Sequence, residues 1–545
     1  MPAVDPGPKG ISAHVDTFTR DNLPPLEQWP EMNWGLDMLA YPSQLNCSVE
    51  LLVKAVDRGW GNRPCTMSAE GAVAYTYIEL NEVSNQIANV LVDDLGLVPG
   101  NRVLLHCFNN PYAVAIWFAI VKAGGVVVAT MPLLRSGELK TILDKARVGL
   151  AIADARLIET VEDVASEGGS VPVPYDGNGD RDLLTLAASK STEFQPVDTA
   201  ADDVVLLAFT SGTTGVPKCT MHFHRDVLAT ADTFQPVLQA TGEDVFCGSP
   251  PLAFTFGLGG LVVFPMRVGA STVLTERPGP PLLQAIQDHS ATICFTAPTA
   301  YRAIADQVDE YDLSSLSKGV SAGETLPEPT FHAFRQATGV SLIDGLGSTE
   351  MLHIFISASG DEIRPGSTGK PLPGVEARVV GEDLEELPPG EVGRLAVRGP
   401  TGCRYLNDRR QSEYVQDGWN LTGDSYIVDE DGYFWFQARA DDMIISSGYN
   451  IAGPEVEASL LKHQAVVECG VVGVPDDTRG QVVKAFVVLR EGRQPSEDLA
   501  AQLKEFVKDD IAAYKYPRQI EFIAALPKTE TGKIQRYKLR ERAPG

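Results

Sequence analysis

A short segment at residues 210–218, reading TSGTTGVPK, brings together groups that bind phosphate, directly after the apolar run VVLLAF. Its hydroxyls belong to Thr210, Ser211, Thr213 and Thr214, its glycines are Gly212 and Gly215, and its positive charge is Lys218. Glycines let a backbone approach a ligand closely, and hydroxyl donors beside an ammonium suit a triphosphate. We therefore predict a nucleotide loop. An ordinary solvent loop is the alternative that this segment, taken alone, leaves open.

The spacing of this loop is GxxGxxK, which differs from the GxxxxGK[ST] spacing of a P-loop. Pro217 stands where a P-loop would continue into its helix, and proline blocks that continuation. The sequence thus indicates a nucleotide loop of another class.

Seven further motifs follow the loop along the chain. They read PPLAFTFGLGG (250–260), SAGETLP (321–327), DGLGSTEMLHIF (344–355), GSTGKPLPG (366–374), LTGD (421–424), ARADDMIISSGYNIAGPEVE (438–457) and PKTETGKIQR (527–536). In wording and order they resemble the motifs of adenylate-forming enzymes, the superfamily of acyl-CoA synthetases, peptide-synthetase adenylation domains and luciferases, and the resemblance covers most of the chain. The resemblance implies an AMP-forming acid–thiol ligase that uses ATP, Mg²⁺ and coenzyme A.

The resemblance also implies roles for single residues. Thr349 would contact the phosphates. Glu350 would hold Mg²⁺, which would neutralise part of the negative charge when the carboxylate of the acid meets the phosphates of ATP. Lys533 would be the principal catalytic group, because a flexible ammonium can reach both the attacking carboxylate and the α-phosphate. Asp424 would accept hydrogen bonds from both ribose hydroxyls, and Arg439 would contact the same nucleotide. Further nucleotide contacts would come from Gly323, Glu324, Gly345, Leu346 and Gly347.

Some of these assignments have structural alternatives. Leu346 stands where the family often has an aromatic residue, so adenine would pack on an aliphatic side chain. Arg439 could instead pair with Asp441 or Asp442 at the surface.

A second half-reaction is implied by the same resemblance. Rotation of the C-terminal domain about a hinge at Asp441 would withdraw Lys533 and bring the segment SSGYN inward. Gly448 would then line a tunnel for a pantetheine thiol, because any side chain would block it. A plain turn is the competing interpretation of Gly448.

The motif DGLGSTEMLHIF, followed by the run to GSTGKPLPG, resembles the version found in benzoate-CoA and 2-aminobenzoate-CoA ligases. The segments DTFTRDNLPPLEQWP and YPSQLNCSVELL resemble the N-terminal part of the 2-aminobenzoate enzymes. This resemblance implies an acyl pocket lined by Phe254, Thr255, Phe256, Gly257, Met351 and His353, with Ile354 nearby. Two aromatic rings and a glycine suit a flat benzene ring, although both phenylalanines could equally be core residues. The best interpretation is a 2-aminobenzoate-CoA ligase. Alternatives are a benzoate- or salicylate-CoA ligase, an enzyme that loads a carrier protein, a medium-chain fatty acyl-CoA synthetase and a non-catalytic nucleotide-binding regulator.

The pattern of elements predicts an α/β fold with a small β-barrel-like subdomain. Strand and helix alternate over residues 101–154 and again over 282–344, which is typical of parallel sheets covered by helices. Short strands with turn residues over 371–400 predict the β subdomain. We expect a large N-terminal nucleotide- and acyl-binding domain over residues 1–440 and a small mobile α+β domain over 441–545.

The composition of the chain limits the kinds of partner that we expect the protein to bind. The chain has 545 residues with 44% apolar content, enough for more than one domain. Its 45 basic and 72 acidic residues give a net charge of −27, which argues against a nucleic-acid surface. Eight scattered cysteines without a CxxC pair, and no secretory signal or membrane span, favour a cytoplasmic protein. The expected partners are a small aromatic carboxylic acid, ATP and coenzyme A, with a homodimer left open.

His222 and His224 form an HxH pair just after the phosphate loop. No third ligand is apparent in the sequence, so hydrogen bonding within the fold is favoured over metal binding.

Overall fold

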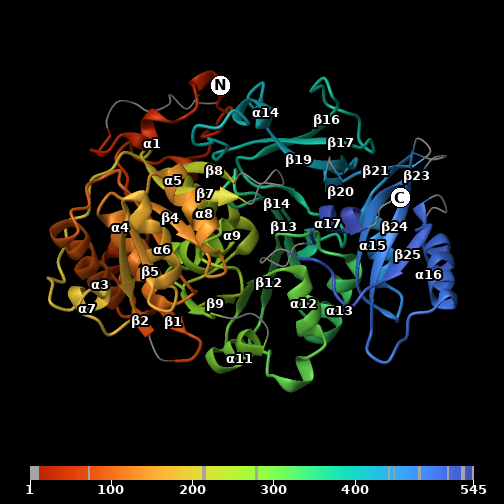
Figure 1. Ribbon diagram of the computed structural model, residues 1–545, viewed down its shortest axis with the longest axis horizontal. Coiled ribbons are helices and arrows are strands. Elements are labelled where there is room, and N and C mark those ends of the chain that lie inside the picture. Colours follow the sequence, from red (N-terminus) through yellow and green to blue (C-terminus); the bar gives the residue numbers. More distant parts are fainter. Residues whose placement is uncertain are drawn as a thin grey trace.

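The structure is a computed structural model of the chain. It describes residues 12–71, 74–210, 217–276, 280–439, 442–446, 449–476, 480–511, 515–528 and 534–542. In Figure 1 the C-terminal elements, in blue, lie at one side of the molecule, next to α12, α13 and β20. The larger part, from red to cyan, contains three sheets.

The first sheet has six strands in the order β6-β5-β3-β4-β7-β8. Their bounds are β3 Arg102–His106, β4 Val126–Thr130, β5 Leu150–Asp154, β6 Val171–Tyr175, β7 Val204–Thr210 and β8 Lys218–Phe223. All pair in parallel except β7 and β8, which form an antiparallel hairpin. The helices among these strands are α3 Tyr77–Asn89, α4 Pro111–Lys122, α5 Ser136–Ala146, α6 Ile158–Gly168 and α7 Leu183–Ala187, and α8 His224–Leu238 follows β8. The predicted alternation over 101–154 is confirmed.

Local sequence sets the ends of these elements. Asn110 caps α4 by accepting a hydrogen bond from the amide of Ala113 at 2.9 Å, and Pro111 occupies the first helical position. The apolar stretch 112–131 forms α4 and then β4, as predicted. Within the described residues, no helix combines the length and the apolar character that crossing a membrane requires.

The second sheet has nine strands in the order β15-β14-β13-β12-β11-β9-β10-β1-β2. Their bounds are β1 Pro64–Ser68, β2 Ala74–Thr76, β9 Val245–Gly248, β10 Ser271–Leu274, β11 Ile293–Thr296, β12 Lys318–Ala322, β13 Leu342–Gly347, β14 Ile354–Ser357 and β15 Lys370–Pro371. The strands from β13 to β1 are parallel, and the edge strands are antiparallel. Its helices are α9 Thr255–Leu258, α10 Phe264–Val268, α11 Pro280–His289, α12 Pro298–Ala305 and α13 Glu328–Thr338.

The β subdomain is an antiparallel sheet that reaches further along the chain than predicted. It consists of β16 Glu376–Val380, β17 Gly393–Arg398, β18 Val415–Gln416, β19 Trp419–Val428 and β20 Phe434–Arg439, with α14 Gln411–Tyr414. The predicted range of 371–400 covered only β16 and β17, because the long β19 follows a segment without a clear strand pattern. The two strands that carry Asp424 and Arg439 therefore belong to this sheet.

The C-terminal elements form a separate sheet with helices. The strands are β21 Ile444–Ser446, β22 Tyr449–Ile451, β23 Val466–Asp476, β24 Gly480–Leu489 and β25 Gln519–Phe522, and the helices are α15 Gly453–Leu461, α16 Glu497–Asp510 and α17 Arg536–Arg542. This confirms a small α+β unit. The exact boundary at 440/441 stays a prediction, since residues 440 and 441 lie outside the described ranges.

Candidate active site

The ends of the phosphate loop are fixed by the β7–β8 hairpin. Thr210, the last residue of β7, and Lys218, the first of β8, face each other as register partners. Ser211, Gly212, Thr213, Thr214 and Gly215 lie outside the described residues. The Lys218 ammonium lies 5.2 Å from the centre of the Tyr405 ring and 5.7 Å from that of Tyr414. This strand therefore directs its cation toward two buried aromatic rings.

Thr349 and Glu350 lie in the turn that follows β13, across from β8. The Glu350 side chain is buried, with 8% of the residue exposed, and the Tyr405 hydroxyl donates a hydrogen bond to its Oε1. The Nε2–H of His222 donates to the carbonyl oxygen of Thr349 at 2.8 Å. The structure thus brings Lys218, Thr349 and Glu350 into one region, and their roles in binding phosphate and metal stay predictions. Tyr405 is the residue that connects them, and sequence reasoning missed it.

The predicted nucleotide contacts of the SAGETLP and DGLGSTE motifs lie at the carboxyl ends of β12 and β13. Ala322 and Gly345 are register partners there, so Gly323 and Glu324 follow directly beside Leu346 and Gly347. Gly323 has a φ of +91°, which a side chain would strain. Leu346 packs against the apolar cluster of the β subdomain. The predicted nucleotide residues of the two motifs are therefore neighbours in space.

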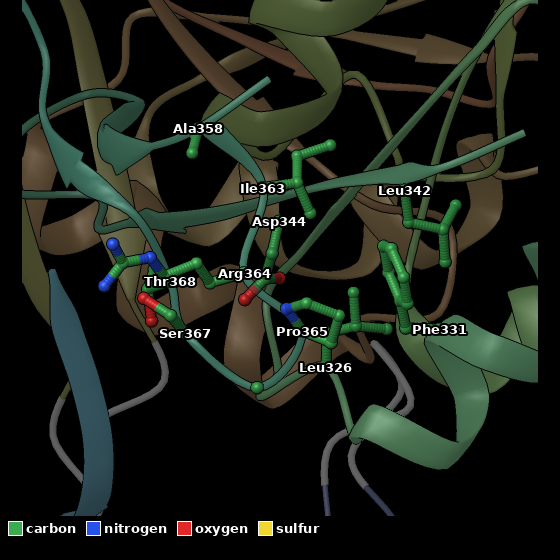
Figure 2. Close-up of a pocket in the computed structure, with 11 residues that line it drawn as sticks. Leu326, Phe331, Leu342, Asp344, Ala358, Ile363, Arg364, Pro365, Ser367 and Thr368 are labelled. Atoms are coloured by element: carbon green, nitrogen blue, oxygen red, sulfur yellow. The ribbon is translucent and has the colours of Figure 1, made fainter. Parts of the chain in front are cut away.

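A buried carboxyl group, Asp344, lies at the same edge and was not singled out from the sequence. Figure 2 shows its side chain in a pocket, directed toward the turn that carries Arg364 and Pro365. Burial raises the pKa of Asp344 to about 8. Within the described residues its Oδ1 has no hydrogen-bond partner. A buried acceptor without a partner is the kind of group that a ligand's amino group satisfies.

Asp424 and Arg439 face each other across the ladder between β19 and β20. Asp424 is buried, and its backbone amide donates to the Thr422 hydroxyl at 3.2 Å. The structure describes only the backbone of Arg439. The backbone register alone therefore places the predicted ribose contact, Asp424, beside Arg439, which was predicted to contact the same nucleotide.

The predicted acyl pocket contains a buried histidine among aromatic rings. The His353 ring centre lies 4.5 Å from that of Phe264, 5.7 Å from Phe256 and 6.0 Å from Phe234. Burial lowers the pKa of His353 to about 3, so its imidazole is neutral at physiological pH. The Phe256 backbone lies beside the ring, yet neither ring nitrogen reaches a partner at ordinary hydrogen-bond geometry within the described residues.

The rest of the predicted lining divides between two places. Phe254, Thr255 and Phe256 are half-buried at the start of α9, where Phe256 also lies 5.7 Å from Phe295. Gly257 has no room for a side chain, because a Cβ there would lie 2.1 Å from the Pro251 carbonyl oxygen. Met351 is buried in the cluster of the β subdomain together with Leu346. Its role in contacting an acid stays a prediction.

A Cβ at Gly259 would lie 2.2 Å from Cδ2 of His353. The position of the imidazole therefore depends on a bare backbone at residue 259.

The C-terminal unit approaches the nucleotide side. Asp441, Gly448 and Lys533 lie outside the described residues, but Arg536, three positions after Lys533, is described. Arg536 donates to both carboxylate oxygens of Glu457 at 2.8 Å. Burial works against its charge, yet the negative charges of Glu457, Asp442 and Glu324 keep the pKa of Arg536 above its usual value. The segment that begins at residue 534 thus lies within electrostatic reach of the SAGET motif.

His222 and His224 both make hydrogen bonds within the fold, as the sequence analysis favoured. His224 accepts from the backbone amide of Cys47 at 3.2 Å, and His222 donates to Thr349. Among the residues that the structure describes, no three His, Cys, Asp or Glu side chains are grouped as a metal cluster. A Mg²⁺ ion held by one carboxylate and substrate phosphates does not need such a cluster.

Comparison with known proteins defines the class. The model of the AMP-binding enzyme family matches residues 53–405, and that of the AMP-binding enzyme C-terminal domain matches residues 455–533. The chain belongs to the AMP-binding enzyme family. Its class is that of the AMP-forming acid–thiol ligases, whose members use ATP, Mg²⁺ and coenzyme A.

Two kinds of relative are particularly similar. Benzoate–CoA ligase of Thauera aromatica is 36% identical over 513 residues, which cover 92% of this chain and 96% of that enzyme. The crystal structure of the anthranilate CoA ligase AuaEII with anthranoyl-AMP has a TM-score of 0.88 and 34% identity, covering 93% of this chain and 99% of that one. A benzoate CoA ligase from Burkholderia xenovorans LB400 has a TM-score of 0.83 and 32% identity, covering 91% and 100%.

Proposed function

We propose that this protein is an ATP-dependent aromatic acid–CoA ligase, with 2-aminobenzoate as its preferred acid. The observation that carries the proposal is His353, a neutral imidazole buried among phenylalanine rings, with ring nitrogens that have no partner at ordinary geometry within the described residues. An aromatic surround suits a benzene ring, and a neutral imidazole offers one donor and one acceptor nitrogen. The similarity to benzoate and anthranilate CoA ligases supports the same class of acid.

The first step joins the acid to AMP. A carboxylate oxygen attacks the α-phosphorus of ATP, the bond from that phosphorus to the bridging oxygen breaks, and pyrophosphate leaves. Lys218, Thr349 and Lys533 would bind and orient the phosphates and the acid, and Asp424 would fix the ribose. Glu350 would hold Mg²⁺, which supplies neutralisation of the phosphate charge.

Two observations on this chain fit ATP and its metal. The unpartnered Oδ1 of Asp344 suits the amino group of adenine, since that group is a hydrogen-bond donor beside the predicted base site. The buried carboxylate of Glu350 suits a cation, because an ionised carboxylate without water requires a positive partner.

The second step transfers the acyl group. The thiolate of coenzyme A attacks the carbonyl carbon of the aryl-adenylate, the bond from that carbon to the phosphate oxygen breaks, and AMP leaves. Rotation about Asp441 would remove Lys533 from the site, and Gly448 would line the path of the thiol.

The preference for an ortho amino group rests on Thr255 and His353. A 2-amino group can donate to the hydroxyl of Thr255 or to the acceptor nitrogen of His353. Benzoate has no group at this position, so it would leave those acceptors without a partner.

Pyrophosphate release tests the proposal. The panel contains 2-aminobenzoate, 2-hydroxybenzoate, benzoate and octanoate, each with and without coenzyme A. We expect the highest kcat/KM with 2-aminobenzoate and the thioester only with coenzyme A. Preference for octanoate would indicate a medium-chain synthetase, and adenylate formation without thioester would indicate a carrier-protein-loading enzyme. A protein that releases no pyrophosphate with any acid would be a nucleotide-binding regulator.

A further inference from the structure

Tyr405 contacts two charged groups of the site at once. Its hydroxyl donates to Oε1 of Glu350 at 2.5 Å, and its ring centre lies 5.2 Å from the ammonium of Lys218. Tyr405 is 1% exposed. One buried side chain therefore joins the strand that follows the phosphate loop to the carboxylate that would hold the metal.

The position of Tyr405 is set by β8 itself. Tyr405 forms an isolated antiparallel bridge with Thr220. On either side of it, the amide of Met221 donates to the Arg404 carbonyl and the amide of Leu406 donates to the Cys219 carbonyl, both at 2.8 Å. The tyrosine thus extends the β7–β8 hairpin by a short third segment, and its partner Thr220 is two residues from Lys218, whose ammonium lies beside the ring.

Two further contacts restrict the side chain. The amide of Tyr405 donates to Oε1 of Gln411 at 2.8 Å, and the ring of Tyr414 packs edge-on at 5.8 Å. A carboxylate oxygen accepts and a phenol hydroxyl donates, so Tyr405 is the donor of the hydrogen bond to Glu350.

We propose that Tyr405 is a positioning residue for the metal-binding carboxylate. Its hydroxyl would hold the Glu350 carboxylate through Oε1 while that carboxylate binds the cation, and its pairing with Thr220 keeps its ring beside Lys218. The inference rests on the proposed function, in which Glu350 holds Mg²⁺. Hydrogen-bonded partners of metal ligands orient those ligands, and their removal commonly lowers metal affinity or activity by about 10- to 100-fold.

Tyr405→Phe tests this role, because it removes the hydroxyl and keeps the ring that faces Lys218. Binding of Mn²⁺ in the presence of a non-hydrolysable ATP analogue is measured directly by electron paramagnetic resonance. We expect the dissociation constant of Mn²⁺ to rise about tenfold or more. Adenylation should require a correspondingly higher Mg²⁺ concentration and recover most of its kcat at saturation, with an unchanged KM for the acid.

Tyr301→Phe is the matched control. The Tyr301 hydroxyl is also fully buried, and it donates to the Cys294 carbonyl at 2.6 Å and to the Val320 carbonyl at 3.2 Å, among the residues that pack against α12 and α13. This variant loses the same group without touching Glu350, so its Mn²⁺ constant should equal that of the wild type. Thermal melting of both variants measures the loss of stability that they share.

A double-variant cycle separates positioning from stability. In a Glu350→Gln background, Tyr405→Phe should cause no further loss of Mn²⁺ binding, because the carboxylate that it orients is absent. Equal Mn²⁺ constants in Tyr405→Phe, Tyr301→Phe and the wild type would overturn the proposal. Failure of the proposed function would show itself differently, as a wild-type protein that binds the analogue without Mn²⁺ or releases no pyrophosphate.

Discussion

His222 and Thr349 join the two large sheets at the site through one hydrogen bond. The imidazole of His222 comes from β8 in the six-stranded sheet, and the Thr349 carbonyl follows β13 in the nine-stranded sheet, with 2.8 Å between Nε2 and the oxygen. Burial, reinforced by the positive charge of Arg404, lowers the pKa of His222 to about 3. The ring is therefore neutral and carries its proton on Nε2.

Replacement of His222 should affect adenylation more than binding of the acid. His222→Leu leaves the Thr349 carbonyl without its donor, which costs about 1–3 kcal/mol, or roughly 5- to 150-fold in rate if the loss falls on the transition state. His222→Gln keeps an N–H donor and should restore most of the activity. Pyrophosphate exchange measures kcat and KM for all three proteins. A His222→Leu enzyme with wild-type kcat would contradict this role for the bond.

Lys533 should act in the first half-reaction only. Lys533→Ala should lower aryl-adenylate formation by about 10²- to 10³-fold, because the developing charge loses its cation. Thioester formation from supplied aryl-adenylate and coenzyme A should be largely preserved. Stopped-flow assays of the two half-reactions measure both rates. Equal loss in both would disprove the alternation of the C-terminal domain.

Thr255 should contribute to selection of the ring substituent. Thr255→Ala removes a hydroxyl whose neutral hydrogen bond is worth about 1 kcal/mol, or about fivefold in selectivity. The ratio of kcat/KM for 2-aminobenzoate to that for benzoate should fall by this factor. His353→Phe, assayed in parallel, tests whether the imidazole nitrogen of His353 accepts a hydrogen bond from the 2-amino group. An unchanged ratio in Thr255→Ala together with a reduced ratio in His353→Phe would assign the ortho preference to the imidazole.

Lys122 should make stability depend on pH. Its buried ammonium, at the end of α4, donates to Asn81, Ser84 and Asn85 at 2.7 Å each, and burial lowers its pKa from 10.5 to about 7. Between these values the unfolded chain binds more protons than the folded one, so the stability due to this group rises with pH. This stability is fully present above about pH 10.5 and is lost progressively as the pH falls to about 7.

The comparison with Lys122→Met isolates this effect. The difference in unfolding free energy between wild type and Lys122→Met should move in favour of the wild type by up to roughly 1.4 kcal/mol per pH unit between about pH 7.5 and 9.5. Urea unfolding at several pH values measures it. Lys54→Met removes a lysine from an exposed ion pair with Glu50 and is the comparison for loss of a surface ammonium. A flat difference for Lys122→Met would show that the lysine does not titrate in this range.

Motifs and periodicity predicted the elements whose signals are local. The run 112–131 contains its own helix and strand signals, and the structure has α4 and β4 there. Glu350 could be found because it belongs to a contiguous motif. Tyr405 could not, since its contact with Glu350 exists only after residues 404–406 pair with β8. His222 gave a partial signal: the HxH spacing indicated a hydrogen bond, but its partner lies on another sheet.

The range of the β subdomain was underestimated for a related physical reason. Asp424 and Arg439 become neighbours through the ladder between β19 and β20, and only the paired strands show that register. Asp344 was overlooked because an aspartate before glycine resembles a turn residue. Its burial depends on the Arg364–Ser367 turn, which packs over it from a later part of the chain.

The contact between Gly259 and His353 restricts how this acyl site can diverge. Any side chain at 259 would collide with the imidazole, and a smaller residue at 353 alone would leave an empty space beside Phe264. A change of acid specificity at Gly259 and His353 therefore requires substitutions at both positions, because either substitution alone is unfavourable for packing.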